Sequence, residues 1–268
     1  MSNRTIIKRS VRLLGLKEKI KNSLNQVIFK PLGYHISRIN EEIYTYDQDG
    51  LKTSHNCDFI REIRFLKAYE RGVKACPEYA NIHWRVHVAL WAASQAIYLP
   101  GDYVECGVNR GFLTSAVMTY IDWNKLGKSF YLFDTFCGLD ESLLTQEEVL
   151  LGRISQSRSQ YRECYEETKE NFSEFERVIL VRGSLPSTLS QPLIGSIAYL
   201  SIDMNCVEPE IKSLEFFWPK LVQHGVVLLD DYAYKGHQPQ KLAIDSFAAK
   251  HHVQVLSLPT GQGLIIKS

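Results

Sequence analysis

Several features that would assign this chain to a special class are missing from its sequence. No apolar run reaches the roughly 18 residues that a membrane-spanning helix needs, and no signal-peptide segment is present. The six cysteines form no Cys-x-x-Cys pair, which argues against a zinc site or a disulfide framework and suits reduced thiols. With 45% apolar and 23% charged residues, the composition excludes a disordered chain. The sequence therefore predicts a cytoplasmic, globular protein.

The small net charge of +1 conceals an uneven distribution of charge along the chain. Residues 1–40 carry nine Lys or Arg and one acid, a net charge of +8, whereas the remaining residues carry −7. Apolar residues recur between these basic residues, an amphipathic pattern that fits peripheral contact with an anionic membrane. The same pattern fits a helix that packs on the protein or on another subunit of a homo-oligomer. We expect no nucleic-acid partner, because no array of aromatic and basic residues follows.

A polar, turn-rich stretch from Glu41 to His55 separates this segment from the rest of the chain. We therefore predict a basic amphipathic N-terminal extension over residues 1–50 and one large domain over residues 51–268. The domain is expected to begin with two helices. Apolar residues of the first share one face: Phe59, Ile63, Leu66 and Tyr69.

The second helix is expected from about Asn81 to Ile97, before Pro100 and Gly101 stop it. Its His83 and His87 are four residues apart, a spacing found in some metal sites. No third ligand lies nearby in the sequence, so a packing role is expected for both.

The stretch from Gly101 to Ile121 is the best-defined local pattern in the chain. An apolar run ends in Glu105, turns through Gly107 and Gly111, and opens a second apolar run at helical spacing. This pattern predicts a strand, a glycine turn and a helix N-terminus, where backbone N–H groups point at a bound ligand. Because position 109 is Asn, the Gly-x-Gly-x-x-Gly turn of dinucleotide-binding proteins is missing.

Further strands alternate with helices, and most of these strands end in an acid. The predicted strands are 130–134, 178–181, 198–202 and 226–229, and the acids that follow them are Asp134, Asp203, Asp230 and Asp231. Two closing strands, 253–258 and 264–267, must be antiparallel because they are close in sequence. Residues 145–171 read as a helical insertion. The fold class predicted is α/β, a doubly wound, Rossmann-like, mainly parallel sheet with an antiparallel closing strand, and polar groups should converge at its carboxyl edge.

Five blocks from about Pro77 to the C-terminus occur in a characteristic order. They read VECGVNRG, FDTFCGLDE, RVILVRGSLPSTL, LSIDMNCVEP and GVVLLDDY. In these blocks the chain resembles the macrocin O-methyltransferase family, S-adenosylmethionine-dependent class I enzymes that methylate sugar hydroxyls. The resemblance implies that residues 51–268 form a methyltransferase domain. It also implies a sugar-containing acceptor on a glycan, a glycolipid or a glycosylated metabolite.

The resemblance also implies a cofactor site for S-adenosylmethionine. Glu105, Gly107 and Gly111 would hold its methionine end, and Asp134 would face its ribose. Thr135 and Ser184, at the ends of the second and third strands, complete the predicted cofactor set. The residues alone leave alternatives open: Asp134 also suits a turn-capping role, and an acid at this position also serves nicotinamide cofactors. A nicotinamide-dependent oxidoreductase and a non-catalytic ligand-binding relative are therefore the competing hypotheses.

Asp203, Asp230 and Asp231 are implied by the resemblance to bind a divalent metal, usually Mg²⁺. Three carboxylates at neighbouring strand ends would repel one another without a cation. The alternative is an Asp pair that caps a turn.

The family commonly places a second Asp two residues after the first metal ligand, where this chain has Asn205. An amide cannot act as a base at neutral pH, so Asn205 is left with a metal-ligand or hydrogen-bonding role. We predict His237 as the general base, because it follows the strand end of Asp230 and Asp231 in a Lys-Gly-His loop. A surface-loop histidine without such a role is the alternative.

Overall fold

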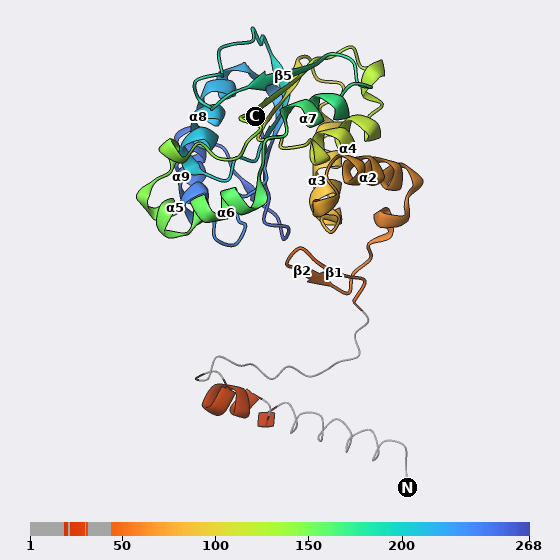
Figure 1. Cartoon of the computed structure of the whole chain (residues 1–268). Coiled ribbons are helices and arrows are strands. Elements are labelled where there is room, and N and C mark those ends of the chain that lie inside the picture. Colours follow the sequence, from red (N-terminus) through yellow and green to blue (C-terminus); the bar gives the residue numbers. More distant parts are fainter. Residues whose placement is uncertain (1–18, 21, 30, 32–43) are drawn as a thin grey trace. The chain divides into compact units, whose positions relative to one another are not determined.

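The protein is described here from a computed structural model, which describes residues 19–20, 22–29, 31 and 44–268 (Figure 1). The chain divides into two units, residues 1–44 and 45–268. In the described part of the first unit, a π-helix spans Asn25–Phe29. The predicted extension covers residues 1–50, and most of its basic part, residues 1–40, lies outside the described residues. Among the helices that are described, none combines the length and apolar character that a membrane crossing requires.

The second unit is built on a seven-stranded sheet with the order β5-β4-β3-β6-β7-β9-β8. The strands are β3 (Asp102–Cys106), β4 (Phe130–Asp134), β5 (Val178–Arg182), β6 (Ile197–Ile202), β7 (Leu221–Leu229), β8 (Leu256–Ser257) and β9 (Gly263–Ile266). Strands β3 to β7 pair in parallel, whereas β9 pairs antiparallel with both β7 and β8. The predicted mainly parallel sheet with an antiparallel closing strand is confirmed. The strand order reverses between β3 and β6, so ligands are expected beyond the carboxyl ends of these strands.

Helices cover both faces of this sheet, and successive strand residues point into opposite layers (Figure 1). On one face Tyr103 packs in a core with α2, α3 and α4, and on the other Val104 packs with α8 and α9. The α-helices are α2 (Ile63–Ala75), α3 (His83–Gln95), α4 (Phe112–Tyr120), α5 (Gln146–Leu150), α6 (Arg153–Gln160), α7 (Tyr165–Asn171), α8 (Val207–Phe217) and α9 (Gln238–Lys250). Short 3₁₀ turns span Asp58–Arg61, Pro77–Tyr79, Trp123–Lys125, Glu141–Leu143 and Trp218–Lys220.

A hairpin of β1 (Tyr46–Gln48) and β2 (Leu51–Thr53) opens the second unit. Asp49 and Gly50 form its two-residue turn with φ values of +51° and +71°, the left-handed conformation typical of Asp-Gly hairpins. Tyr46 is buried. This hairpin spans residue 50, at which the sequence places the start of the domain.

The predicted apolar face of the first helix is wrong. Ile63 is 73% exposed and Leu66 is 40% exposed, whereas Phe65, Ala68 and Tyr69 are buried. The helix begins only at Ile63, because residues 58–61 form a separate 3₁₀ turn, and Phe59 is therefore out of phase with it. The strand predicted over 253–258 is shorter in the structure, where β8 covers only Leu256–Ser257. The helical insertion predicted over 145–171 is confirmed by α5, α6 and α7.

Candidate active site

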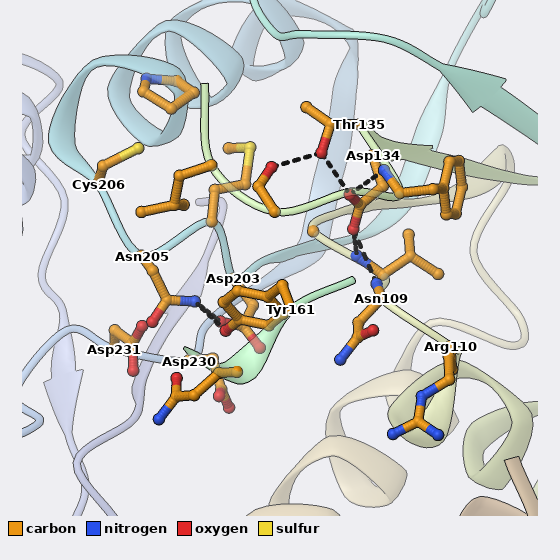
Figure 2. Close-up of a pocket in the computed structure, with 18 of the residues that line it drawn as sticks. Asn109, Arg110, Asp134, Thr135, Tyr161, Asp203, Asn205, Cys206, Asp230 and Asp231 are labelled. Carbon is orange, nitrogen blue, oxygen red and sulfur yellow. Dashed lines mark hydrogen bonds between the residues drawn. The ribbon is translucent and has the colours of Figure 1, made fainter. Parts of the chain in front are cut away.

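A cavity of about 280 Å³ lies beyond the carboxyl ends of β3, β4, β6 and β7 (Figure 2). The helical insertion contributes to its wall through Gln156, Gln160 and Tyr161. All predicted site residues except Gly111 line the cavity, namely Glu105, Gly107, Asp134, Thr135, Ser184, Asp203, Asn205, Asp230, Asp231 and His237. The strand ends that the sequence spreads over more than 120 positions thus meet in one place, as the parallel topology requires.

The two glycines of the turn after β3 are required by close packing. Gly107 has φ +89°, and a Cβ at this position would overlap the carbonyl oxygen of Asp203. Gly111 has φ +84°, and a Cβ there would overlap the ring of Phe172. Only glycine fits both the left-handed backbone and these close approaches. The turn is therefore locked against the end of β6 on one side and against an aromatic ring on the other.

Glu105 is a buried acid at the penultimate position of β3. Its Oε2 atom has no hydrogen-bond partner among the described residues, although the side chain lines the cavity. Burial raises the pKa of Glu105 well above its usual range, and the nearby charges of Asp203 and Asp134 add to this shift. A buried carboxyl group without a donor is costly unless a ligand supplies one, so Glu105 suits a cationic or hydrogen-bond-donating ligand group.

Asp134 connects the turn after β3 to the turn after β4 by accepting hydrogen bonds from backbone N–H groups of both (Figure 2). Its Oδ2 accepts hydrogen bonds from Val108 N at 2.6 Å and from Asn109 N at 2.7 Å. Its Oδ1 accepts from Phe136 N at 2.7 Å. The Thr135 hydroxyl lies 3.3 Å from Oδ1 but makes a shorter bond to Gly138 O. Asp134 therefore has the turn-capping role that was the alternative interpretation of the sequence. One lone pair of its Oδ1 faces no backbone donor.

Ser184 lies at the end of β5 and donates a hydrogen bond to Asp140 Oδ2 at 2.6 Å. Hydrogen bonds from Ser142 and Ser184 lower the pKa of the Asp140 carboxyl group. Ser184 thus joins the loop after β4 to the loop after β5 at the wall of the cavity. Direct contact of Thr135, Ser184 or the two turn glycines with a cofactor stays a prediction.

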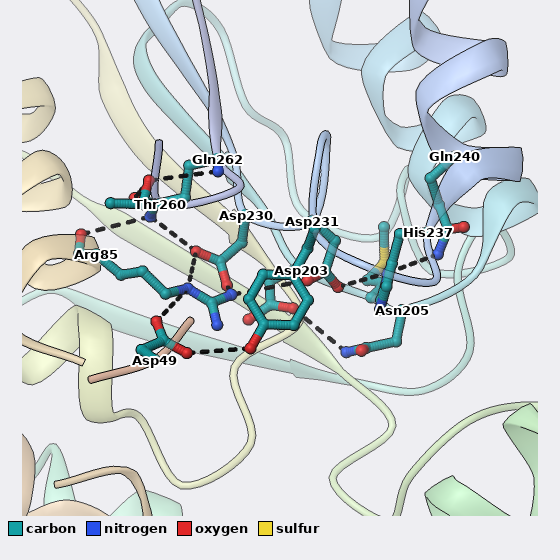
Figure 3. Close-up of polar contacts among 12 residues, drawn as sticks. Asp49, Arg85, Asp203, Asn205, Asp230, Asp231, His237, Gln240, Thr260 and Gln262 are labelled. Carbon is teal, nitrogen blue, oxygen red and sulfur yellow. Dashed lines mark hydrogen bonds and ion pairs between the residues drawn. The ribbon is translucent and has the colours of Figure 1, made fainter. Parts of the chain in front are cut away.

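At the other end of the cavity, Asp203, Asp230 and Asp231 form an acidic cluster (Figure 3). One carboxylate oxygen of each lies within 4.8 Å of the others, close enough for all three to bind one cation. Burial, followed by the charge of Asp231, raises the pKa of Asp203. Burial also opposes ionisation of Asp231, but the hydrogen bond and charge of His237, with Arg85 and Arg153, outweigh it and lower the pKa of Asp231. The cluster therefore retains negative charge and needs a positive partner.

Arg85, which the sequence did not single out as a site residue, supplies positive charge to this cluster from α3. Its Nη2 forms a short hydrogen bond with Asp230 Oδ2 and lies 3.7 Å from Asp231 Oδ1. Gln262, from the loop before β9, donates a further bond to Asp230 Oδ1 at 2.8 Å. Neither residue lies next to the acids in sequence. The sequence shows only that Arg85 lies between His83 and His87 in the first turns of α3, which does not identify its target.

His237 is buried at the edge of the cluster. Its Nδ1 lies 3.1 Å from Asp231 Oδ2 and 3.1 Å from Gln240 Nε2 (Figure 3). Nδ1 has either a proton, which it can donate to Asp231, or a lone pair, which can accept from Gln240 Nε2. A general-base role for His237 requires the first tautomer, in which Nε2 has the lone pair. Its loop is held from the insertion, since Arg153 donates a hydrogen bond to Gly236 O at 2.8 Å. The structure thus places His237 beside the acidic cluster rather than on the surface.

Asn205 lies between the acidic cluster and the helical insertion. Its side-chain amide lies 3.3 Å from Asp203 Oδ1 and 3.2 Å from the hydroxyl of Tyr161 (Figure 2). Burial and the charge of Asp203 raise the pKa of Tyr161. Tyr161 was not predicted as a site residue, because the sequence of the helical insertion does not show which of its side chains point toward the strand ends.

His83 and His87 pack on aromatic rings. His83 stacks on Tyr69 with ring centroids 4.1 Å apart, and His87 stacks on Phe59 at 4.0 Å. Burial lowers the pKa of both imidazoles, which favours their neutral forms. Within the described part of the chain they belong to no cluster of three potential metal ligands, in agreement with the packing role expected for them.

Comparison with known proteins identifies relatives of this chain. The demethyldecarbamoylnovobiocin O-methyltransferase of Streptomyces niveus is 27% identical over 166 residues, which cover 58% of this chain and 61% of that protein. The match thus spans less than two thirds of that relative's length.

Two solved structures share the fold. The O-methyltransferase NovP has a TM-score of 0.61 and 23% identity, with 69% of this chain and 79% of that chain covered. The calicheamicin methyltransferase CalS11 has a TM-score of 0.56 and 18% identity, with 76% and 93% covered. At these identities the likeness shows the fold, that of class I methyltransferases.

The family model for macrocin O-methyltransferases (TylF) matches residues 88–256. This range is more than half of the chain, and it contains every predicted site residue from Glu105 to His237. The chain therefore belongs to the macrocin O-methyltransferase (TylF) family.

Proposed function

We propose that this chain transfers a methyl group from S-adenosylmethionine to a sugar hydroxyl, with Mg²⁺ held by Asp203, Asp230 and Asp231. The observation that carries the proposal is that one cavity joins the glycine turn after β3 to the acidic cluster after β6 and β7. A methyl donor at the turn and a hydroxyl at the carboxylates would meet in the alignment that displacement requires. Membership of the family favours methyl transfer over a nicotinamide-dependent oxidoreductase or a non-catalytic relative.

The cofactor end of the cavity supports S-adenosylmethionine through its unpaired acceptors. Glu105 Oε2 is buried without a donor, which suits the ammonium group of the methionine part. The remaining lone pair of Asp134 Oδ1 suits a ribose hydroxyl, because the Thr135 proton has a closer acceptor in Gly138 O. Gly107 leaves the backbone open to a ligand, whereas Gly111 would act by fixing the turn.

The acidic end supports a hard divalent cation, because its donors are all carboxylate oxygens within reach of one ion. Bound Mg²⁺ would supply a Lewis acid that lowers the pKa of a coordinated hydroxyl and orients its oxygen. Asn205 would hold the acceptor or the Asp203 carboxylate in place through its amide. His237, whose Nδ1 would donate to Asp231 and whose loop is held by the Arg153–Gly236 bond, would take the hydroxyl proton on Nε2.

The acceptor is proposed to carry a sugar. CalS11 is described as a calicheamicin methyltransferase, and the Streptomyces niveus relative as acting on demethyldecarbamoylnovobiocin. For this chain a glycan, a glycolipid or a glycosylated metabolite would each present the required hydroxyl. Mass spectrometry of glycans and glycosylated metabolites from cells with and without the gene tests this point. A mass difference of one methyl group on a sugar-bearing compound is expected, and identical profiles would contradict it.

Binding of the cofactor is tested by calorimetry on the purified protein. S-adenosylmethionine should bind, and the double variant Glu105→Gln/Asp134→Ala should bind it much more weakly. Absence of heat at millimolar S-adenosylmethionine, together with clear binding of a nicotinamide dinucleotide, would support the oxidoreductase instead.

The basic segment over residues 1–40 is proposed to contact an anionic membrane surface, since it combines a net charge of +8 with interleaved apolar residues. The test is sedimentation with anionic vesicles of the full chain and of a chain lacking residues 1–40. Equal sedimentation of the two would contradict membrane contact and leave packing, on this chain or on a second subunit, as the role of the segment.

A further inference from the structure

Arg85 is a permanent positive charge placed directly on the proposed metal ligands. Its guanidinium bonds Asp230 through Nη2, and its Nε lies 3.4 Å from Asp230 Oδ1. The side chain is only 15% exposed, and the guanidinium lies 4.9 Å from the centroid of the Tyr234 ring. An arginine stays protonated in proteins, so this charge cannot be removed by loss of a proton.

A divalent cation and Arg85 would compete for the same carboxylate groups. The cluster offers one oxygen each from Asp203, Asp230 and Asp231 to an ion, and Arg85 contacts the last two of these residues. Two positive centres on one carboxylate repel each other strongly in a partly dry site. A buried guanidinium left without an acceptor would be costly as well. Metal binding therefore requires that Arg85 have another acceptor within reach.

Asp49, at the tip of the β1–β2 hairpin, is that acceptor. Its Oδ2 lies 4.0 Å from Arg85 Nε, and its Oδ1 accepts a hydrogen bond from the Tyr234 hydroxyl at 3.0 Å (Figure 3). Its side chain is only 13% exposed. In the described part of the chain, the carboxylates within 4 Å of Arg85 are those of Asp49, Asp230 and Asp231. A small movement of the guanidinium along the Tyr234 ring would therefore exchange Asp230 for Asp49.

The hairpin is held toward α3 by more than this one charge. Gln48 Oε1 lies 3.0 Å from His83 Nδ1, and the Tyr46 ring packs edge-on against the His83 ring with centroids 6.1 Å apart. Asp49 has φ +51°, a left-handed conformation that Asp tolerates and that directs its side chain from the turn toward Arg85. The contacts of β1 therefore position one carboxylate beside the cluster without making it a member of the cluster.

We propose that Arg85 is a resident counter-ion of the acidic cluster, which transfers from Asp230 to Asp49 when a divalent cation binds and thereby couples metal binding to docking of the β1–β2 hairpin. This inference rests on the metal site of the proposed function. Arg85 lowers metal affinity by occupying Asp230, whereas Asp49 raises it by receiving the displaced guanidinium. The hairpin tip is bound more tightly in the metal-loaded protein, because the full charge of Arg85 is then shared with Asp49.

The test is a double-mutant cycle in which Mn²⁺ is titrated into the full-length protein by calorimetry. Mn²⁺ is the probe because it accepts the same oxygen ligands as Mg²⁺. Asp49→Asn should weaken Mn²⁺ binding by about fivefold or more, the lower end of coupling between two sites. Arg85→Met, which keeps much of the side-chain length, should strengthen it. In the Arg85→Met background, Asp49→Asn should have little effect, because no guanidinium remains to be received.

The matched control is Asp47→Asn. Asp47 belongs to the same hairpin and carries the same charge, but it is exposed and pairs with Lys52 at 2.7 Å. The Asp47→Asn substitution should leave Mn²⁺ affinity unchanged. If Asp49→Asn weakens Mn²⁺ binding equally with and without Arg85, the effect is long-range electrostatics and the transfer is wrong.

Amide hydrogen exchange at residues 45–53 provides a second readout that does not depend on Arg85→Met. Mn²⁺ should slow this exchange in the wild type and in Asp47→Asn, but not in Asp49→Asn. Mn²⁺ binding by the wild type with unaltered hairpin exchange would overturn the coupling and leave the proposed metal site intact. No binding by either the wild type or Arg85→Met would overturn the metal site and the transfer together.

Discussion

The two ends of the cavity satisfy their carboxylates in different ways. At the glycine-turn end, Asp134 accepts hydrogen bonds from backbone N–H groups of Val108, Asn109 and Phe136. At the acidic end, Asp230 faces the Arg85 guanidinium and the Gln262 amide, and Asp231 faces the His237 imidazole. Backbone donors are fixed once the strands pair, whereas a guanidinium can move and an imidazole can change its protonation. The glycine-turn end is therefore rigid, whereas at the acidic end the positive partners of the carboxylates can be exchanged.

The largest effect should come from removing a carboxylate of the acidic cluster. Asp203→Ala and Asp230→Ala are each expected to lower kcat by about 10³-fold or more, because they remove preorganised charge where the hydroxyl reacts. Chelation with EDTA should have the same result. The measurement is methyl transfer from labelled S-adenosylmethionine, with cofactor affinity followed by calorimetry as the control. Full turnover in excess EDTA would exclude the metal from the reaction.

The next effect concerns the proton. His237→Ala should lower kcat by about 10²-fold, the usual scale of a lost general base, while S-adenosylmethionine affinity stays close to that of the wild type. His252→Ala, an exposed histidine beyond α9, is the matched control and should have no effect. Equal kcat values for the His237 variant and the wild type would assign the proton to another group or to water.

At the rigid end the expected effect is on stability. Gly107→Ala should lower the free energy of unfolding by about 3 kcal/mol, because its Cβ would overlap the Asp203 carbonyl oxygen, which belongs to the end of β6. Gly50→Ala is the matched control: it has φ +71°, but no atom lies within 4 Å of the point that its Cβ would occupy. Gly50→Ala should lower the free energy of unfolding by only about 1 kcal/mol, the cost of placing alanine in a left-handed backbone conformation. Urea denaturation measures both, and equal losses would show that the close approach is unimportant.

The smallest effect is a pH-dependent stability difference at Glu105. Its pKa is raised above the ordinary value of 4.5, so the cofactor-free folded protein holds a proton that the unfolded chain has released. The stability contributed by this group is thus present below about pH 4.5 and is lost as the pH rises. Glu105→Gln cannot ionise, so its melting temperature should exceed that of the wild type increasingly from pH 5 to pH 8.

Each kcal/mol of this stability difference should raise the melting temperature of the variant by about 2–4 °C for a domain of this size. The exposed Glu147→Gln is the control for general removal of negative charge. A difference for Glu105→Gln that is independent of pH would contradict a burial-shifted carboxyl group.

Local sequence patterns predicted much of the rigid end. The apolar run before Glu105, the glycines of the turn and the acid at position 134 are close in sequence and obey simple periodicity, and β3, α4 and β4 lie where these patterns predict them. The same reasoning failed at α2. There Ile63 and Leu66 face outward, whereas Phe65, Ala68 and Tyr69 are buried. Repeated steps of three residues drift around a helix with 3.6 residues per turn, so residues 63, 66 and 69 do not share one face.

The partners of the acidic cluster were not predictable in this way. Arg85 from α3 and Gln262 from the loop before β9 contact Asp230, and Tyr161 from the end of α6 contacts Asn205. None of these three residues belongs to a recognisable motif, and none of them alters the hydrophobic periodicity around it. Their contact with the site depends on which way a helix or loop side chain turns after packing.

The amino-acid sequence was sufficient to predict the strands of the parallel sheet, the acids that end them and the family that the five ordered blocks resemble. These properties depend on residues within a few positions of one another and on the rule that parallel strands end at one edge. The balance of charge, in contrast, follows from tertiary packing. Arg85 from α3, Asp49 from the hairpin and His237 from the loop before α9 meet the acids because separate elements pack together. Coulombic interactions depend on distance in space rather than along the chain, so charge balance is a property of the folded protein.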